Sequence, residues 1–295
     1  MAVGIFAYYF YFRLRSSWDE LVAKADFQIS WQAVTAVLCF VTAVLTSGAL
    51  WSEVVSAVKH TAEPVIRKRE AVRVHTGAWL LKYVPGQVSG AVYKIAWGKQ
   101  NGVSAATATL SFVYENAFLT IASILPSSVL LLADGRLPGE TNLVLAVLGI
   151  AATLLLFSRA VLRRFLWVIG GRSSSSRTSV RTISLRESVR LSAMYILPRI
   201  FNGIGFVALA SSVFRVDIAD FAPLVAAYAL AGIIGIYAVF VPSGLGVREA
   251  MVGVFAAGVL GYDKALLLGL VTRFYATVAD VVLAVSYALL TLKRS

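Results

Sequence analysis

Several apolar runs in this chain are long enough to cross a lipid bilayer. The runs at 28–58 and 103–133 both exceed the roughly 20 residues that an α-helix needs to span a hydrocarbon core. Within lipid, every backbone N–H and C=O group must find a partner in the protein, so only helices and closed barrels can cross. The short alternating segments of a barrel do not occur in this sequence. The sequence therefore predicts an all-α polytopic membrane protein.

Composition and charge agree with this class and argue against others. Hydrophobic residues make up 59% of the chain and charged residues 14%, and the mean hydropathy is +0.79, which a soluble domain would not tolerate. The net charge of +12 is concentrated in two links: 59–73 has five Lys/Arg against two Glu, and 159–190 has eight Arg against one Glu. We expect both links to face the cytoplasm and its anionic lipids. We expect no nucleic-acid partner, because the chain has no polar domain.

The sequence offers no support for a metal or cofactor site. Cys39 is the only cysteine and lies in an apolar run, so no internal disulfide can form. The two histidines, His60 and His75, have no partner at ligand spacing. We therefore expect neither a metal nor a cofactor.

Two apolar runs are interrupted by proline and glycine. Pro85-Gly86 divides 71–97 into arms of about 14 and 12 residues, which are too short to span the membrane alone. Pro242-Ser243-Gly244 divides 221–260 into arms of about 20 residues. Paired interruptions in corresponding halves of a membrane protein point to a substrate site near the midplane.

The same features follow both interruptions. Gly102 comes 17 residues after Pro85, and Glu115 comes 13 residues after that glycine. In the second run, a glycine comes 19 residues after Pro242, and Arg273 comes 12 residues after it. The chain therefore repeats one pattern: a broken apolar segment, a glycine turn, and a charge inside an apolar run.

The two basic links determine the predicted path of the chain. If both lie inside, the broken run 71–97 must begin and end inside, as a re-entrant hairpin turned at Pro85-Gly86. The run 221–260 then begins and ends outside, as a second re-entrant hairpin, and Lys293-Arg294 lie inside. The predicted full crossings are 28–58, 103–133, 141–161, 186–213 and 264–290. Two full spans within 221–260 are the alternative, but they would place the basic C-terminus outside.

This path predicts an inverted-topology repeat. Repeat one covers about 1–133 and repeat two about 141–290, joined through 134–140, with 159–190 as a basic cytoplasmic linker inside repeat two. Residues 1–12 are apolar but span only about 18 Å as a helix. We therefore expect that the first helix begins upstream of Met1, and a half-span with an aromatic interfacial end is the alternative.

The two predicted hairpins would bring loop amides and half-helix N-termini together near the midplane. Their positive dipole ends suit a phosphate or a carboxylate. We expect no catalytic residue. The residues expected to bind substrate are Lys82, Pro85, Gly86 and Lys94 at the first break, Pro242, Gly244, Gly246, Arg248 and Glu249 at the second, and Glu115, Arg199, Arg273 and Asp280 in the remaining helices.

The charges near the breaks also have a structural interpretation. Lys82 and Lys94 can extend their ammonium groups to the membrane interface. Arg248 and Glu249 can form a local pair that caps a hairpin arm.

Glu115 and Arg273 are predicted to lie at mid-membrane, where an unpaired charge is costly. Glu115 is roughly 18 Å along its helix and Arg273 roughly 14 Å along its own. We expect them to face a shared central cavity and to pair when it is empty, and a purely structural ion pair is the alternative. Asp280, seven residues after Arg273, could relay a proton or neutralise that arginine.

These residues resemble the flippase-like membrane domain of lysylphosphatidylglycerol synthases. The similarity rests on Val84-Pro85-Gly86 with the distant Glu115, and on the Pro-x-Gly-x-Gly-x-x-Glu segment from Pro242 to Glu249 followed by Arg273. It extends over nearly the whole chain. The resemblance implies a flippase for a lipid with an anionic or zwitterionic head, such as an aminoacyl-phospholipid or a polyprenyl-phosphate-linked sugar. No aminoacyl-transfer domain follows in this sequence, so we expect a stand-alone member that is not an enzyme.

The leading functional expectation is a lipid transporter in the cytoplasmic membrane. The sequence has no Gly-x-x-x-x-Gly-Lys-Ser/Thr loop, so gradients, the membrane potential or mass action would drive it. Its expected partners are the lipid itself, anionic lipids at the cytoplasmic face, and a lipid- or glycan-synthesising enzyme. The alternatives are an integral-membrane lipid-linked transferase and a non-transporting scaffold of envelope biosynthesis.

Overall fold

The computed structural model describes residues 30–83, 89–135, 147, 183–238, 244 and 246–292, and every regular element in these ranges is a helix. Five helical segments are long and apolar enough to cross a membrane, which makes this an all-α chain of the multi-pass membrane class. They are Trp31–Val58, Ala105–Asp134, Leu185–Val213, Ile218–Tyr237 and Tyr262–Leu289. Several predictions lie outside the described residues, namely those for 1–12, most of 141–161, the arginine-rich part of 159–190, Pro85, Gly86, Pro242 and Lys293-Arg294.

Three long helices begin and end within a turn of their predicted limits. They are α2 (Trp31–Val58), α5 (Ala105–Asp134) and α13 (Tyr262–Leu292). A serine N-cap begins two of them: Ser30 accepts a hydrogen bond from the backbone of Ala33, and Ser104 accepts one from Thr107. The lengths of the apolar runs and their caps are local features, which is why the sequence predicts these helices well.

The predicted single helix at 186–213 is divided in two. The structure shows α8 (Leu185–Met194) and α9 (Ile196–Val213), separated at Tyr195. The cause is Pro198, which has no N–H to donate to the carbonyl of Met194, four residues earlier, and whose ring crowds that carbonyl. The residue after this proline is Arg199, so the break lies next to a half-buried cation.

The first interrupted run forms two short helices. They are α3 (Lys68–Leu80), extended by the 3-10 turn η1 (Leu81–Tyr83), and α4 (Ser89–Gln100). Each of the two α-helices is shorter than a membrane span, as predicted.

The second interrupted run is more fragmented than predicted. It comprises α10 (Phe221–Tyr237), α11 (Val247–Phe255) and α12 (Ala257–Leu260), and the 3-10 turn η3 (Ile218–Asp220) comes directly before it. The predicted continuous arm at 243–260 is therefore wrong. The second arm is divided at Ala256, and neither α11, with nine residues, nor α12, with four, is long enough alone to cross a bilayer.

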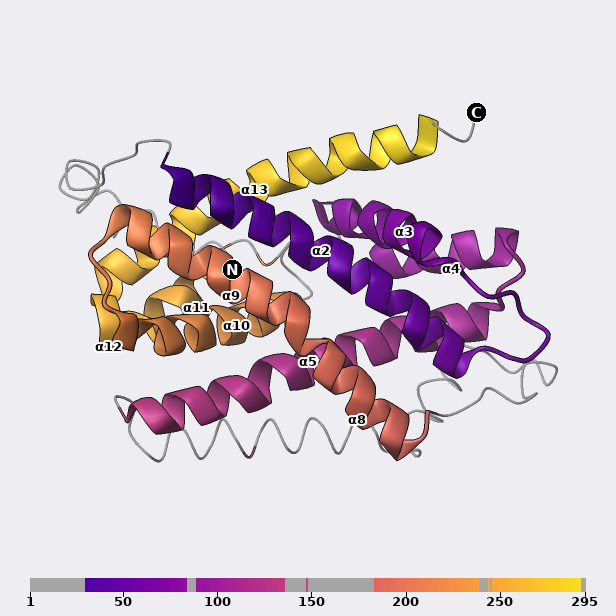
Figure 1. The fold of residues 1–295 in the computed structure, drawn as a ribbon, viewed down its shortest axis with the longest axis horizontal. Coiled ribbons are helices and arrows are strands. Elements are labelled where there is room, and N and C mark those ends of the chain that lie inside the picture. The colour runs from indigo at the N-terminus through magenta and orange to yellow at the C-terminus, as the bar shows by residue number, and fades with distance from the viewer. Residues whose placement is uncertain are drawn as a thin grey trace, which may run out of the picture.

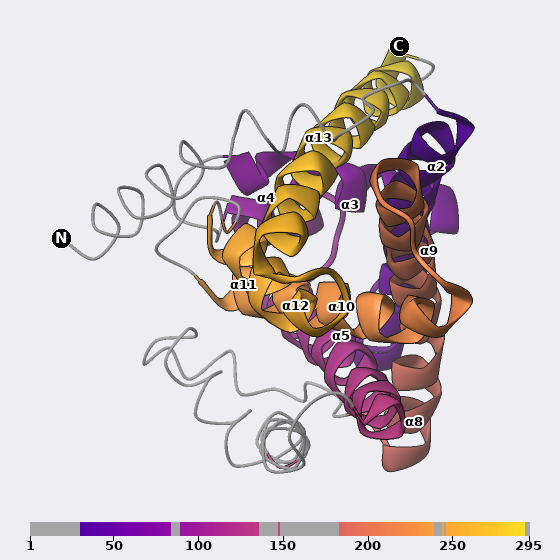
Figure 2. The ribbon, with the colours of Figure 1, turned by 90° about the vertical axis from the view of Figure 1, so that its left-hand side faces the viewer.

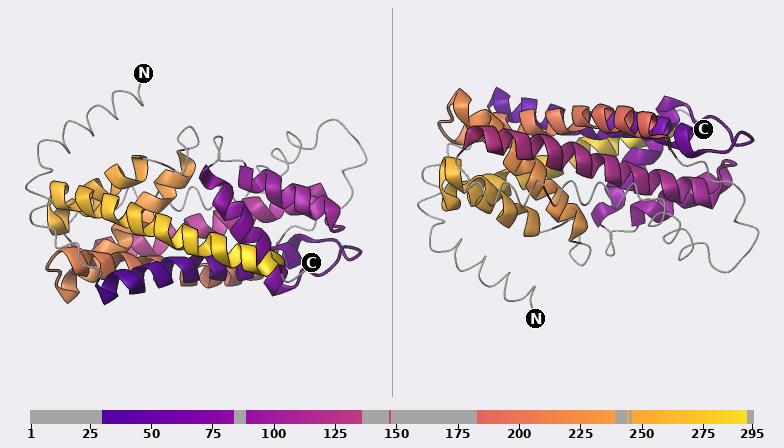
Figure 3. Two further views of the ribbon diagram at one scale, coloured as in Figure 1. Left: turned by 90° about the horizontal axis from the view of Figure 1, so that it is seen from above. Right: turned by 90° about the horizontal axis from the view of Figure 1, so that it is seen from below.

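The long helices run along the long axis of the molecule, and the short pairs occupy opposite ends (Figure 1). In that view α3 and α4 lie toward the right, with the C-terminal ends of α2 and α13, while α10, α11 and α12 lie toward the left (Figures 1 and 3). Figure 2 looks along the bundle from the left-hand side of Figure 1 and shows α9 beside α2. The α2 helix packs against α9 and α3, α5 against α10, and α11 against α13.

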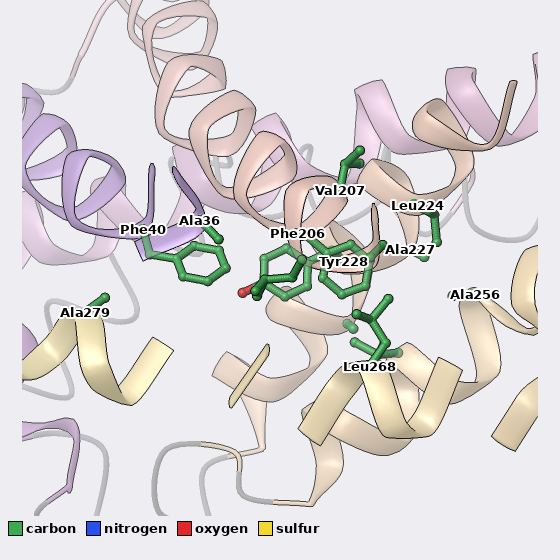
Figure 4. Packing of buried hydrophobic residues seen from close by; sticks show 14 of the residues in the cluster. Ala36, Phe40, Phe206, Val207, Leu224, Ala227, Tyr228, Ala256, Leu268 and Ala279 are labelled. Atoms are coloured by element: carbon green, nitrogen blue, oxygen red, sulfur yellow. The ribbon is translucent and has the colours of Figure 1, made fainter. Parts of the chain in front are cut away.

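An aromatic row joins the two halves of the chain. The rings of Phe206 and Tyr228 stack with centroids 4.4 Å apart, and the rings of Phe40 and Tyr228 lie 6.0 Å apart. Figure 4 shows these three rings between α2, α9 and α10, within the largest buried hydrophobic cluster. Phe40 and Tyr228 also line a cavity, so this cluster supports one wall of the candidate site.

Candidate functional site

A cavity of about 110 Å³ lies where the two halves of the chain meet. Its lining comes from α2, α3, η1, α5, α9, α10, α11 and α13. Four cationic side chains line it: Lys82, Arg199, Arg248 and Arg273. Among the described lining residues Asp280 is the only carboxylate, so these residues carry an excess of three positive charges when histidine is neutral, before the contact of Arg273 with Glu249 is counted.

Lys82 and Asp280 form the first ion pair of the wall. Lys82 Nζ lies 2.7 Å from Asp280 Oδ2 and 4.2 Å from the ring centroid of Trp79. Asp280 also accepts hydrogen bonds from Trp79 Nε1 at 2.8 Å and from the Tyr83 hydroxyl. The carboxylate therefore neutralises Lys82, 198 residues away in sequence, and the hypothesis that it neutralises Arg273 is wrong.

Glu249 connects the second break to α13. Its Oε2 accepts a hydrogen bond from the backbone N–H of Gly246 at 2.7 Å, which caps the start of α11. Its Oε1 lies 3.9 Å from Nη1 of Arg273. The adjacent Arg248 instead places its guanidinium 4.5 Å from the ring centroid of Tyr228. Glu249 thus caps the start of α11, but the expected local pair with Arg248 does not form, and the ionic contact of Glu249 is with Arg273.

Gly244 brings the second break close to α10. Its φ of +63° is a left-handed conformation that L side chains rarely adopt. A Cβ at this position would lie 2.8 Å from the carbonyl oxygen of Gly235. Glycine is therefore required here for two reasons, and the close approach holds the start of α11 beside the cavity.

Arg199 is a poorly satisfied cation of the cavity wall. Its Nη2 donates a long hydrogen bond of 3.4 Å to the carbonyl of Leu119. Its Nε is buried and has no hydrogen-bond partner within the described part of the chain. In those same residues neither Arg199 nor Arg248 forms an ion pair with a carboxylate, so both are available to an anion.

A second buried cluster lies next to the cavity. Lys94 Nζ donates to Glu115 Oε2 at 2.5 Å, and His75 Nδ1 lies 2.9 Å from Glu115 Oε1. All three residues are almost inaccessible, with 2%, 2% and 7% of the surface of Lys94, Glu115 and His75 exposed. Lys94 also lies 4.6 Å from the ring centroid of Trp51. A buried ammonium with these partners does not reach the interface, so the alternative in which Lys94 extends there is wrong.

The expected pair between Glu115 and Arg273 does not form. Glu115 is paired with Lys94 and His75, while Arg273 lies 3.9 Å from Glu249. His75 is not among the residues that the sequence predicts for the site, because it has no second metal ligand near it in the sequence. Its position could still have indicated a role, since His75 and Lys94 lie on the two arms of one interrupted run.

No protein-family model matches this chain, and no curated protein is found to be similar to it.

Proposed function

We propose that this protein is a lipid flippase that moves a lipid with an anionic or phosphate-linked head group across the membrane. The observation that carries the proposal is the cavity wall, on which Lys82, Arg199, Arg248 and Arg273 face a single described carboxylate. Charges inside a membrane protein are costly and usually serve function. Arginines suit phosphate because their planar donors bind two oxygens at once. An anionic head group would balance the excess charge.

The proposed substrates follow from this chemistry together with the sequence resemblance. A phosphate-bearing head would occupy the cavity while its apolar chains remain in the bilayer. Aminoacyl-phospholipids and polyprenyl-phosphate-linked sugars both have such heads. A flippase-like domain would act beside the enzyme that makes its lipid.

The size of the cavity suggests a closed conformation. About 110 Å³ accommodates several water molecules, whereas sites for whole ligands usually reach about 300–1,000 Å³. The present cavity would therefore admit a phosphate group but not a complete sugar or aminoacyl head. Transport would require a wider state in which the halves of the chain separate, first on one face and then on the other.

The placement of the short helices supports an alternating-access architecture. The pair α3 and α4 lies at one end of the bundle and the pair α10 and α11 at the other (Figure 1). We interpret the pairs as re-entrant hairpins of an inverted repeat, with repeat one at about 1–133 and repeat two at about 141–290. The basic links 59–73 and 159–190 would then lie on the cytoplasmic side of the inner membrane, with the C-terminus.

Lipid translocation in proteoliposomes tests the proposal. Fluorescent phosphatidylglycerol, aminoacylated phosphatidylglycerol and a polyprenyl-phosphate lipid would be incorporated, and dithionite added outside would quench only the outer-leaflet label. We expect the protein to accelerate the loss of inner-leaflet label for at least one anionic class. Arg199→Gln and Arg248→Gln should each abolish most of that acceleration.

Arg190→Gln is the matched control, because this arginine precedes the α8–α9 break but is 62% exposed and 3.4 Å from Glu53, outside the cavity. It should behave as wild type. Folded protein that moves none of the lipids, or cavity variants that move them as fast as wild type, would contradict the proposal.

A further inference from the structure

The proposed anion site does not use the cluster of His75, Lys94 and Glu115, although His75 lines the cavity. The three side chains come from α3, α4 and α5, and the His75 ring is part of the cavity lining. Lys94 and Glu115 neutralise each other. The charge of the cluster is therefore zero when His75 is neutral and +1 when His75 carries a second proton.

The hydrogen bonds of the cluster compete for one nitrogen. His75 Nδ1 lies 3.2 Å from Lys94 Nζ and 2.9 Å from Glu115 Oε1. If Nδ1 accepts from Lys94, it has no proton for Glu115, and the buried Oε1 then has no donor, as observed. If Nδ1 carries a proton, it donates to Oε1 and Lys94 keeps only its bond to Oε2. The cluster therefore has two hydrogen-bonded arrangements that differ in where a proton resides.

We infer that His75, Lys94 and Glu115 form a proton-binding site coupled to anion binding in the adjacent cavity. The inference rests on the proposed anion site. The site takes one proton from water, the ring nitrogens of His75 then both carry protons, and Nδ1–H donates to the Glu115 carboxylate. Release reverses this step, and no covalent bond other than N–H forms or breaks.

The charges around His75 determine the direction of the coupling. Across the cavity it faces Lys82 on η1, Arg199 on α9, Arg248 on α11, and Arg273 with Asp280 on α13. The α2 helix lines the same space with Phe40, Ala43, Val44 and Ser47, none of which titrates. On its own helix, Arg73 is paired with Glu70. Tyr83 on η1 and Tyr228 on α10 are phenols that line the same cavity, and Tyr195 at the α8–α9 turn interacts electrostatically with Glu115.

An empty cavity therefore presents excess positive charge and disfavours a second proton on His75. A bound anion neutralises the cations and favours that proton. By reciprocity, a proton on His75 strengthens anion binding by the same factor. An anionic head would thus bind together with a proton, and the two would be released together.

Calorimetry on the purified full chain measures this coupling directly. Dihexanoyl-phosphatidylglycerol is a suitable probe, because its phosphodiester does not titrate near neutral pH. Titrations at pH 7 in two buffers of different ionisation enthalpy give the number of protons taken up on binding. We expect a fraction of one proton for wild type, and a dissociation constant that decreases as pH falls from 8 to 6 by at most about tenfold per unit.

The two histidines of the chain provide a matched pair of variants. His75→Gln should bind the probe without proton uptake and without pH dependence. His60→Gln, in the link between α2 and α3, should keep the wild-type uptake. Glu115→Gln offers a second variant that removes the negative charge of the carboxylate while leaving the histidine, and it should reduce the uptake.

The outcomes separate the two proposals. Binding by wild type without proton uptake contradicts the coupling and leaves the anion site intact. Uptake that persists in folded His75→Gln also contradicts the coupling. Absence of binding at every pH contradicts the anion site and the coupling together.

Discussion

At the level of single residues, the Lys94–Glu115 pair shows how two buried charges offset each other's desolvation cost. Each side chain is 2% exposed, so each would incur a large desolvation cost alone. The pair offsets that cost with a direct hydrogen bond, while His75 and the Trp51 ring occupy the remaining sides. Such a pair contributes little net stability, but it is costly to break from one side.

A double-mutant cycle should expose this asymmetry. Lys94→Met and Glu115→Leu should each lower the free energy of unfolding by about 3–5 kcal/mol, because each leaves one buried charge unpaired. The combined variant should lie close to wild type, because both charges are then gone. Denaturation of the detergent-solubilised variants, followed by circular dichroism, measures the three values.

Additive losses in the combined variant would show that the two charges do not depend on each other. A combined variant that is stable but has lost lipid translocation would show that the pair serves function.

At the level of elements, one carboxylate ties the α2–α3 link to the start of α5. Glu63 accepts hydrogen bonds from the backbone N–H of Ser104 at 3.0 Å and from the Thr107 hydroxyl at 3.2 Å. Its other oxygen accepts from the backbone N–H of His60 at 3.3 Å. Burial raises the pKa of Glu63, but these hydrogen bonds outweigh it and hold the pKa below its ordinary value. The ionised form is therefore the one that fastens the link.

Replacing Glu63 with glutamine should destabilise the protein in a pH-dependent way. The lowered folded-state pKa means that the carboxylate contributes stability above its unfolded pKa of about 4.3 and loses that contribution as pH falls through the folded value. At pH 7 we expect a loss of about 1 kcal/mol. The difference between Glu63→Gln and wild type should shrink below pH 4 or so, measured by thermal unfolding across pH.

Glu53→Gln provides the comparison. Its two ion pairs, with Lys68 at 3.6 Å and Arg190 at 3.4 Å, involve largely exposed partners and should contribute little. A Glu63→Gln deficit that is constant across pH would contradict the role assigned to the ionised carboxylate.

At the level of the whole molecule, the helix ends separate into two groups. One end of the bundle holds the end of α2, the starts of α3 and α8, and the end of α13 (Figures 1 and 3). The other end holds the start of α2, the end of α9 and the start of α13. If that axis crosses the membrane, the first group lies with the basic links. The positive-inside rule then assigns it to the cytoplasm.

Cysteine labelling in whole cells can test this sidedness. Cys39 is the only native cysteine and can be changed to alanine. Single cysteines would then be placed at Ala62, exposed in the α2–α3 link, and at Ile218, 84% exposed before α10. A membrane-impermeant maleimide should label Ile218→Cys in intact cells and label Ala62→Cys only after permeabilisation. Labelling of both sites from the same side would contradict the proposed topology.

The sequence alone predicts the class of this protein and most of its helices, because apolar length, serine caps and Pro-Gly breaks all act locally. It also identifies most of the charged residues of the cavity wall, since a charge inside an apolar run is conspicuous. The division at Tyr195 was missed, although Pro198 and the carbonyl four residues before it are local too. For Ile218–Tyr237, which joins η3 and α10 into a segment long enough to span, composition could not separate a hairpin arm from a crossing.

Only the tertiary structure decides which charges meet. Residue counting gives the depth of Glu115 and Arg273 along their helices, but not the direction in which each side chain points. That direction depends on how the helices pack, and packing places Lys94 and His75 beside Glu115, and Glu249 beside Arg273. The same holds for Lys82 and Asp280, which are distant in sequence and 2.7 Å apart in the fold. Which charged side chains pair across helices depends on how those helices are oriented toward each other. The order of residues along the chain does not determine that orientation by itself.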